Sequence, residues 1–260
     1  MKAADTRVLL TGAGGGIGRA AVRALSGAGA QVLGVGRSAA PSGADTAHLW
    51  LQADVTTSEG RAAIVQAARA WRANVVVHAA GVPAFGAVGT LNAAEVERVL
   101  QVNLVAPIQL TQALLPQLAA QPRAQLVFVG SALGAIGLPG FAVYGAGKAG
   151  LQRYAEALRR ELAETPVRVQ TLLPRSTYTA FNDAAASAYN RATGSASDAP
   201  ERVAAALLRL IESEAAETHL GWPERLFVRL NGLLGARLDG GFGKHRRALA
   251  SPLPIKEGTT

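Results

Sequence analysis

The run Thr11-Gly12-Ala13-Gly14-Gly15-Gly16-Ile17-Gly18 constrains the fold of this chain more than any other feature. It follows an apolar run at 7–10 that indicates a strand, and it leads into a helical pattern at 17–28. A glycine turn in this place lets the backbone approach a pyrophosphate, while the helix start offers free N–H groups to the anion. A dinucleotide site is therefore predicted, with candidate contacts at Gly12, Gly14, Gly15, Gly16, Ile17 and Gly18.

Short apolar runs alternate with Ala- and Leu-rich segments along the rest of the chain. Further strands are expected at 31–35, 49–51, 75–77, 125–129 and 167–172. Helices are expected at 58–71 with Ser58 as its N-cap, at 93–118 with an interruption at Pro107, at 143–163 and at 200–213. Short apolar strands separated by helices are typical of a parallel sheet covered on both faces. The expected fold class is α/β, with a doubly wound (Rossmann) sheet.

The chain shows no linker or internal repeat that would divide it. We expect a single Rossmann-type domain over residues 1–250, followed by a flexible tail at 251–260. Within the domain, 175–199 is rich in small polar residues and is expected to be a loop with weak helical content that contacts substrate. A helical segment is expected at 222–238, and its apolar face beside arginines fits packing on the protein better than contact with a membrane surface.

Composition excludes several classes of protein. The chain has no cysteine, and His48, His78, His219 and His245 are scattered, so no metal site is expected. The formal net charge is +8, but only 244–247 forms a compact basic run, so no nucleic-acid partner is expected. The N-terminal residues lack a signal-peptide layout, and we expect no apolar run that approaches the ~20 residues of a membrane span. A cytoplasmic location is the expectation.

The end of the second predicted strand suggests which dinucleotide binds. An NAD site usually places a carboxylate here to bond the ribose 2′-hydroxyl. This chain instead has Arg37 and Ser38, and a guanidinium can pair with a 2′-phosphate. NADP(H) is therefore favoured over NAD(H). Asp54, after the third strand, is a candidate either for the adenine amino group or for a turn cap.

Tyr144 and Lys148 lie one helical turn apart at the start of the predicted helix 143–163, so their side chains share a face. A nearby ammonium favours the phenolate, which would lower the pKa of Tyr144 and suit it to exchange a proton with a carbonyl or alcohol oxygen. Ser131 follows the strand 125–129, where a hydroxyl can bond a substrate carbonyl. The carbonyl of Asn103 lacks an N–H partner at Pro107, and we hypothesise that it holds a water in a proton relay.

As a set, these residues resemble the short-chain dehydrogenase/reductase family. Thr11, Gly12, Gly16 and Gly18 match its glycine motif, Asp54-Val55 matches its acidic pair, and the catalytic tetrad of the family is matched by Asn103, Ser131, Tyr144 and Lys148. The resemblance covers about residues 6–179. It implies a sheet of about seven strands, a homodimer or homotetramer, and cofactor contacts at Val55, Ala80, Gly81, Tyr144, Lys148, Pro174, Thr177 and Thr179.

Two positions depart from the family pattern. His78 stands where the family has Asn before Ala79-Ala80-Gly81, and a structural role is expected for it. Arg175 replaces the usual glycine after Pro174, which leaves the geometry of the substrate entrance open. Phe181, Tyr178 and Tyr189 are candidates for an apolar substrate pocket.

The resemblance implies a hydride transfer between the nicotinamide and a carbonyl or secondary alcohol, with an NADPH-dependent reduction of a ketone or 3-oxoacyl thioester favoured. An NAD-dependent alcohol dehydrogenase remains open, because the tetrad does not fix the direction. A non-catalytic dinucleotide-sensing regulator is a second alternative, although such proteins usually lose the Tyr or the Lys. A nucleotide-sugar epimerase is disfavoured by the glycine spacing.

Overall fold

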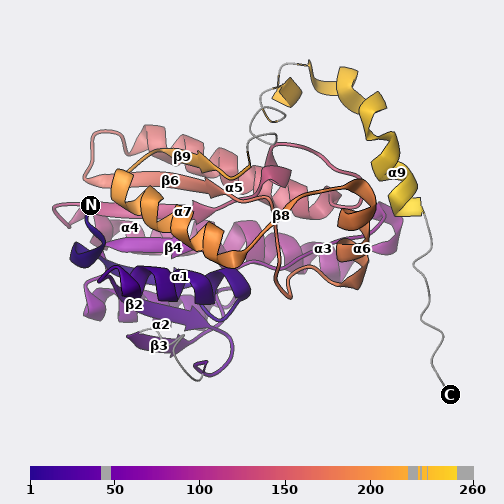
Figure 1. The fold of residues 1–260 in the computed structure, drawn as a ribbon. Helices are drawn as coiled ribbons and strands as arrows, with labels where there is room; N and C mark the ends of the chain where they lie inside the picture. Colours follow the sequence, from indigo (N-terminus) through magenta and orange to yellow (C-terminus); the bar gives the residue numbers. More distant parts are fainter. Residues whose placement is uncertain (42–47, 222–227, 229, 233, 251–260) are drawn as a thin grey trace.

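The computed structural model describes residues 1–41, 48–221, 228, 230–232 and 234–250. Its centre is a parallel sheet that has seven strands within these ranges (Figure 1). The strands lie in the order β3-β2-β1-β4-β5-β6-β9, and every neighbouring pair is parallel. Their bounds are β1 (Arg7–Thr11), β2 (Gln31–Gly36), β3 (Leu49–Gln52), β4 (Val75–His78), β5 (Ala124–Val129), β6 (Val167–Leu173) and β9 (Glu217–His219).

The strand order reverses between β1 and β4. The chain runs outward from β1 through β2 and β3, and then returns to β4 on the other side of β1. In open parallel sheets the crevice for a ligand lies at this switch point, beyond the carboxyl ends of the strands. The expected doubly wound fold is confirmed, and it places the glycine turn after β1 at the crevice.

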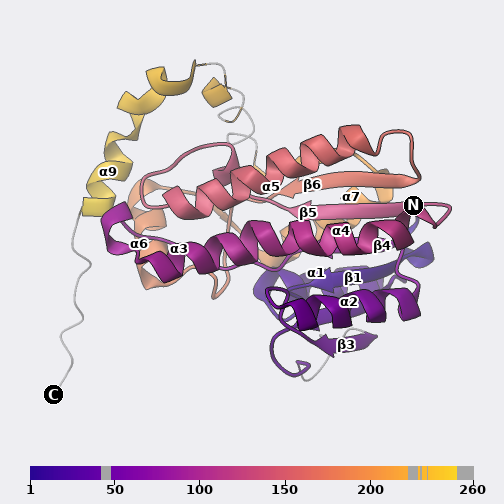
Figure 2. The same ribbon diagram turned by 180° about the vertical axis from the view of Figure 1, so that it is seen from behind.

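Helices cover both faces of the sheet (Figures 1 and 2). On one face, α1 (Gly16–Gly27) and α7 (Pro200–Ser213) pack against Val8 and Leu10. On the other, α2 (Ser58–Trp71), α4 (Ala106–Ala119) and α5 (Ala142–Glu161) pack against Leu9. Because successive strand residues point to opposite faces, β1 contributes to both cores, and strands buried on both faces read as continuous apolar runs.

The long helical stretch before β5 is continuous. It begins as α3 (Ala93–Leu100), passes through a π-helical turn at Gln101–Val105 and continues as α4, whose first turn contains Pro107. The Ala106 N–H donates to the carbonyl of Gln101, five residues earlier. The expected interruption is present as this π-helical turn, which lies directly before Pro107, and the helical path of the chain continues through it.

The stretch Ala93–Ala119 is long and apolar enough to cross a membrane by length and composition alone. The expectation that no apolar run approaches that length needs this correction. In the fold, Leu110, Leu114 and Leu118 are buried against the sheet. This is the packing of a core helix of a globular domain.

Other expectations were wrong at element ends and after β6. Thr57, rather than Ser58, caps α2, since its hydroxyl accepts the Gly60 N–H. The region 175–199 holds paired strands β7 (Ser176–Thr177) and β8 (Ser197–Asp198) with α6 (Ala184–Thr193) between them, and β9 was not foreseen.

The C-terminal part of the described chain lies against the segment 175–199, which was predicted to contact substrate. After a 3₁₀ segment at Gly235–Phe242, α9 (Gly243–Ala250) packs on α6 (Figure 2). Much of the helical segment predicted at 222–238, and all of the tail predicted at 251–260, lies outside the described residues.

Candidate active site

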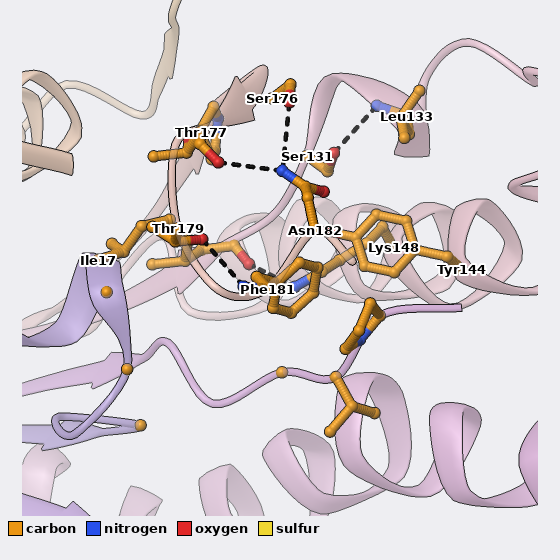
Figure 3. Close-up of a pocket in the computed structure, with 18 of the residues that line it drawn as sticks. Ile17, Ser131, Leu133, Tyr144, Lys148, Ser176, Thr177, Thr179, Phe181 and Asn182 are labelled. Atoms are coloured by element: carbon orange, nitrogen blue, oxygen red, sulfur yellow. Dashed lines mark hydrogen bonds between the residues drawn. The ribbon is translucent and has the colours of Figure 1, made fainter. Parts of the chain in front are cut away.

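A single cavity of about 950 Å³ opens at the carboxyl ends of β1, β4, β5 and β6 and extends from the glycine turn to α9. Its wall includes every residue that the sequence suggested for cofactor binding. It also includes Ser131, Tyr144 and Lys148, which Figure 3 shows around the same space. Of the four residues predicted to be catalytic, Asn103 alone lies behind the wall.

The glycine turn is fixed by close backbone contacts. Gly12 has φ +70°, and a Cβ atom there would lie 2.7 Å from the Ala80 Cα. A Cβ on Gly18 would lie 2.1 Å from the Gly12 carbonyl oxygen. The Thr11 hydroxyl accepts N–H bonds from Ala79 and Ala80, at 3.1 and 3.2 Å. The ends of β1 and β4 are thereby drawn together, and no larger residue fits at these two glycines.

The start of α1 faces the cavity without a capping side chain. Gly15 is its N-cap, no side chain bonds the terminal N–H groups, and the first turn holds no acidic residue. The Arg19 guanidinium lies beside it and donates to the Gly14 carbonyl at 3.0 Å. Free N–H groups, a helix dipole and an arginine fit the pyrophosphate of a dinucleotide. Sequence reasoning missed Arg19, although its position directly after the glycine motif was a signal.

The end of β2 carries Arg37 and Ser38, both exposed at the cavity. The indole of Trp50, which the sequence analysis did not single out, packs within 2.6 Å of where a Gly36 Cβ would lie and donates to the Ser38 carbonyl at 3.1 Å. One face of this subsite is therefore aromatic, which suits a purine ring.

Asp54 is committed in part to its own turn. Its Oδ1 accepts from both the N–H and the hydroxyl of Thr56, at 2.8 and 2.7 Å. Burial by itself would raise the pKa of Asp54, but these two bonds and the nearby Arg37 outweigh it and hold the pKa below its usual value. Both readings of Asp54 thus have support: it caps a turn, and it also lines the cavity.

The catalytic candidates converge from α5 and the end of β5. The Lys148 ammonium is buried, donates to the Val129 carbonyl at 2.9 Å and lies 5.9 Å from the centre of the Tyr144 ring. The Ser131 hydroxyl accepts the Leu133 N–H at 3.1 Å and lies close enough to the Tyr144 phenol to act on its pKa. This arrangement holds a phenol, a hydroxyl and an ammonium around one substrate position.

Asn103 lies in the π-helical turn and is fully buried. Its side-chain amide makes two bonds to the backbone of Val82, accepting the N–H and donating to the carbonyl, both at 2.9 Å. A Cβ atom on Gly81 would lie 3.3 Å from the Asn103 Oδ1 and 3.8 Å from the Lys148 Nζ. Asn103 is therefore beside Lys148, as the relay hypothesis requires, and its side chain fixes the segment after β4.

The two glycines between Tyr144 and Lys148 mark close contacts of the helix. A Cβ atom on Gly145 would lie 3.0 Å from the Leu133 carbonyl oxygen, and one on Gly147 would lie 3.5 Å from the Asn103 Cβ. Other segments of the chain therefore approach α5 closely at this end. Small residues at this end let the helix sit against both the Ser131 segment and the π-helical turn.

The expected effect of Lys148 on Tyr144 is not found in the structure. Burial raises the pKa of Tyr144 to about 12, although the nearby Ser131 hydroxyl acts to lower it, and burial lowers the pKa of Lys148 to about 8. The ammonium points to the Val129 carbonyl rather than to the phenol oxygen, so desolvation outweighs the charge. The phenol therefore keeps its proton at neutral pH and is available as an acid.

His78 occupies a structural position, as the sequence suggested. It is buried, its Nε2 lies 2.9 Å from the Thr111 hydroxyl on α4, and its ring stacks on Phe128 with centroids 5.0 Å apart. Burial lowers the pKa of His78 to about 3. A neutral imidazole enclosed in this way ties β4 to α4 and does not act as a base.

Arg175 has a definite place at the substrate entrance. Its guanidinium makes two bonds to the carboxylate of Asp198, at 3.0 and 2.9 Å, and Arg202 donates to the same carboxylate at 2.9 Å. Asp198 is buried, and it pairs through β8 with Thr177 of β7. The departure from the family pattern thus ties down the loop that carries Thr177 and Thr179. The sequence analysis missed Asp198, because no pattern near it in the sequence indicates that it pairs with Arg175.

The substrate half of the cavity is aromatic. Phe181 lies edge-on to Tyr144 with ring centroids 5.8 Å apart (Figure 3). Tyr189 is buried behind the wall rather than in it. Tyr178 is 72% exposed and points away, so its assignment to the pocket was wrong. Phe85, Phe141, Phe242 and His245 complete this wall, and sequence reasoning did not find them.

Comparison with known proteins agrees with this geometry. The family model for short chain dehydrogenases matches residues 6–190. The chain is 32% identical to the ketoacyl reductase HetN of a Nostoc species over 177 residues, which are 64% of this chain and 62% of that protein. A short-chain dehydrogenase from Streptomyces avermitilis is 25% identical, with a TM-score of 0.76 over 90% of this chain and 96% of that one.

A short chain dehydrogenase from Burkholderia cenocepacia, solved with NADP, shares the fold at 24% identity, with a TM-score of 0.76 over 97% of this chain and 100% of that one. The matched region of the family model holds the glycine turn, Ser131, Tyr144 and Lys148, which the fold gathers around one cavity. The chain belongs to the short-chain dehydrogenase family.

Proposed function

We propose that this protein is an NADP(H)-dependent reductase of ketones. One observation carries the proposal: the Tyr144 phenol, the Ser131 hydroxyl and the Lys148 ammonium border the same cavity as the uncapped start of α1. A nicotinamide dinucleotide bound along that cavity supplies the hydride for the reaction. The residues described above fit such a cofactor, since its pyrophosphate finds free N–H groups and no acidic side chain at the helix start.

Each side chain then has a distinct role at the carbonyl. Ser131 and Tyr144 both hydrogen-bond the carbonyl oxygen, which stabilises the charge that develops on it. Tyr144 gives its proton to that oxygen, and its raised pKa of about 12 favours the protonated phenol that a reduction needs. The buried charge of Lys148 stabilises the phenolate that remains, and Asn103 holds the wall behind Lys148 through Val82.

The preference for NADP(H) rests on the end of β2. No carboxylate stands there to bond a ribose 2′-hydroxyl, and Arg37 faces the cavity with its charge close to Asp54. A guanidinium in this place can bond a 2′-phosphate through two N–H groups.

The cofactor preference is tested with Arg37→Asp and a charge-matched control, Arg98→Asp on α3, which lies outside the cavity wall. Binding of NADPH and NADH is followed by the fluorescence of Trp50, which lines the cofactor half of the cavity. We expect Arg37→Asp to weaken NADPH at least tenfold and NADH little, and the control to change neither. Equal weakening of both cofactors, or tighter NADH binding by the natural chain, contradicts the preference.

The substrate class is proposed as a ketone, with a 3-oxoacyl thioester as the nearest variant because the relative HetN is named a ketoacyl reductase. The test is oxidation of NADPH and NADH against a panel of 3-oxoacyl thioesters, quinones, aldehydes and ketones, with the reverse reaction assayed on secondary alcohols. Turnover of ketones with NADPH supports the proposal. Turnover only of alcohols with NAD⁺ indicates the alternative alcohol dehydrogenase, and no turnover with any class indicates a dinucleotide-sensing regulator.

We also propose that the protein forms a homodimer or homotetramer with α5 in the interface. In support, α5 lies on the outside of the fold, and no helix of the described chain covers it (Figure 2). Light scattering gives the assembly mass. A monomer at micromolar concentration contradicts this part of the proposal.

A further inference from the structure

We propose that His245, on α9, is a specificity-determining residue: it closes the substrate end of the cavity and donates a hydrogen bond to a polar oxygen on a ring-bearing ketone. The oxygen acceptor would lie at the end of the substrate opposite the reacting carbonyl. The inference rests on the proposed reductase function and names the class of substrate that this site takes.

A continuous series of rings leads from the catalytic tyrosine to His245. The ring centroids of Tyr144 and Phe141 are 6.5 Å apart, those of Phe141 and Tyr189 are 5.7 Å apart, and those of Tyr189 and His245 are 5.6 Å apart. Phe242 adds a ring 5.8 Å from His245. Of these rings, Phe141, Tyr144, Phe242 and His245 line the cavity, and Tyr189 lies behind them. An aromatic wall of this kind favours a ligand with a flat ring, because offset stacking and edge contacts add to the burial of apolar surface.

The rest of the substrate half offers few polar groups. Leu133, Ile136, Leu138 and Phe181 line it, and the Asn231 amide that reaches it donates to the Ala135 carbonyl. The polar side chains that reach it from α6 and its two ends each bond within the protein: Asn182, Asp183, Asn190 and Ser195. His245 is thus a polar group set within an apolar surface. A pocket with this distribution binds an apolar body and uses the polar group to fix its orientation.

His245 is held in place from behind the wall. Its Nδ1 lies 2.7 Å from the hydroxyl of Tyr189, which is buried. Burial raises the pKa of Tyr189 to about 12, and burial, followed by the nearby Lys244, lowers the pKa of His245. At neutral pH the phenol is therefore protonated and the imidazole neutral. In the proposed arrangement the phenol donates to Nδ1, which places the ring proton on Nε2.

The second ring nitrogen is the one that a ligand can reach. Nδ1 faces Tyr189 behind the wall, whereas His245 lines the cavity. Within the part of the chain that the structure describes, Nε2 has no hydrogen-bond partner. An N–H donor without a partner in an apolar pocket favours an oxygen acceptor on the ligand.

The helix that carries His245 is seated by its own apolar contacts. Ala248 and Leu249 of α9 pack on the cluster formed by Phe141, Ala186 and Tyr189. These contacts join α9 to α6, and α9 lies beyond residues 6–190 that match the family model. The feature that selects the substrate is thus supplied by a segment outside the shared part of the family.

The experiment measures binding of two matched ketones to the protein saturated with NADP⁺, where no reduction occurs. The probes are 2-acetylnaphthalene and its 6-hydroxy derivative, which differ only in a remote oxygen. We expect the hydroxy probe to bind about tenfold tighter, which corresponds to one hydrogen bond to a donor that otherwise stays unpaired. His245→Phe should abolish this ratio, and His245→Gln, which keeps an N–H donor, should retain part of it.

Two further variants guard against a structural effect. Lys244→Gln on the same helix lies outside the cavity wall and should keep the tenfold ratio. Tyr189→Phe keeps the ring but frees Nδ1, and it should reduce the ratio. If His245→Phe weakens both probes equally because α9 has moved, the comparison of His245→Gln with Lys244→Gln decides the question.

Several results would overturn the proposal. A ratio near one in the natural chain, or a ratio that persists in both His245 variants, removes His245 from the role. Tighter binding of a linear 3-oxobutanoyl N-acetylcysteamine thioester than of either naphthyl probe removes the ring-bearing class. A preserved tenfold ratio without any NADPH oxidation supports the role of His245 in binding and contradicts the reductase function instead, so the two failures are distinguishable.

Discussion

The cofactor side of the cavity is shaped by backbone, whereas the substrate side is shaped by long side chains. On the first side, Gly12 and Gly18 bring β1, β4 and α1 so close that a single methyl group would collide with main-chain atoms. On the second side, Asp198 and His245 reach their partners across the chain, and rings and ion pairs make the contacts. A local glycine pattern in the sequence marks the contacts of the first kind. The contacts of the second kind depend on which distant residues pack together in the fold.

The largest effect should come from filling a backbone contact on the cofactor side. Gly18→Ala places a methyl group against the Gly12 carbonyl, and we expect it to lower the free energy of unfolding by about 3 kcal/mol or more. Gly27→Ala is the control in the same helix, because a Cβ there meets nothing within 4 Å. It should be neutral or stabilise by up to about 1 kcal/mol. Urea unfolding measures both, and equal stability of the two variants would break the comparison.

On the substrate side, the matching change is Asp198→Asn. It removes the charge that Arg175 and Arg202 share, and we expect a loss of about 2 kcal/mol, since the carboxylate is buried while Arg202 is exposed. The loss should be accompanied by a higher KM, because Thr177 and Thr179 line the cavity and lie on the loop that Asp198 holds in place.

The control for Asp198→Asn is Glu201→Gln, whose ion pair with Arg23 is exposed on both sides. Its cost should stay under about 1 kcal/mol. If Asp198→Asn has no larger effect than this control, side-chain pairing does not hold the substrate side.

His78 sharpens the comparison, because it is a side-chain contact on the cofactor side. Its pKa is about 3 in the folded protein and about 6.5 when exposed, so the unfolded chain binds the extra proton first as the pH falls. Stability from this group is complete above pH 6.5 and is lost progressively towards pH 3. Between pH 7 and pH 5 the loss should be about 2 kcal/mol.

The measurement is the change in unfolding free energy between pH 7 and pH 5 for the natural chain and for His78→Asn. Carboxylates contribute alike to both proteins, so the difference isolates the imidazole. A variant with the same pH dependence as the natural chain would show that the His78 ring is not kept neutral by burial.

The same contrast explains what the sequence could predict. The glycine turn, the strand before it and the Tyr144–Lys148 pair are local patterns, in which spacing along the chain determines geometry in space. The alternation of strands and helices in turn predicted the doubly wound sheet. The predicted cofactor contacts follow from these patterns, because the predicted residues lie at or just beyond the carboxyl ends of the strands and line the same cavity.

What the sequence did not predict depends on contacts between distant residues. β9 is a short polar edge strand without an apolar run, and it forms because β6 offers a free edge. The pairs Arg175–Asp198 and Tyr189–His245 join residues that no pattern links. The pKa of Tyr144 was also expected in the wrong direction, because its desolvation is a property of the packed site rather than of the spacing to Lys148.

The most direct test of the site is single-turnover oxidation of NADPH by the natural chain and by Tyr144→Phe with the best ketone from the panel. Removal of the proton donor should slow turnover about a thousandfold, while the dissociation constant of NADPH changes less than about fivefold. A variant that reduces the ketone within tenfold of the natural rate would contradict the assignment of Tyr144 as the acid.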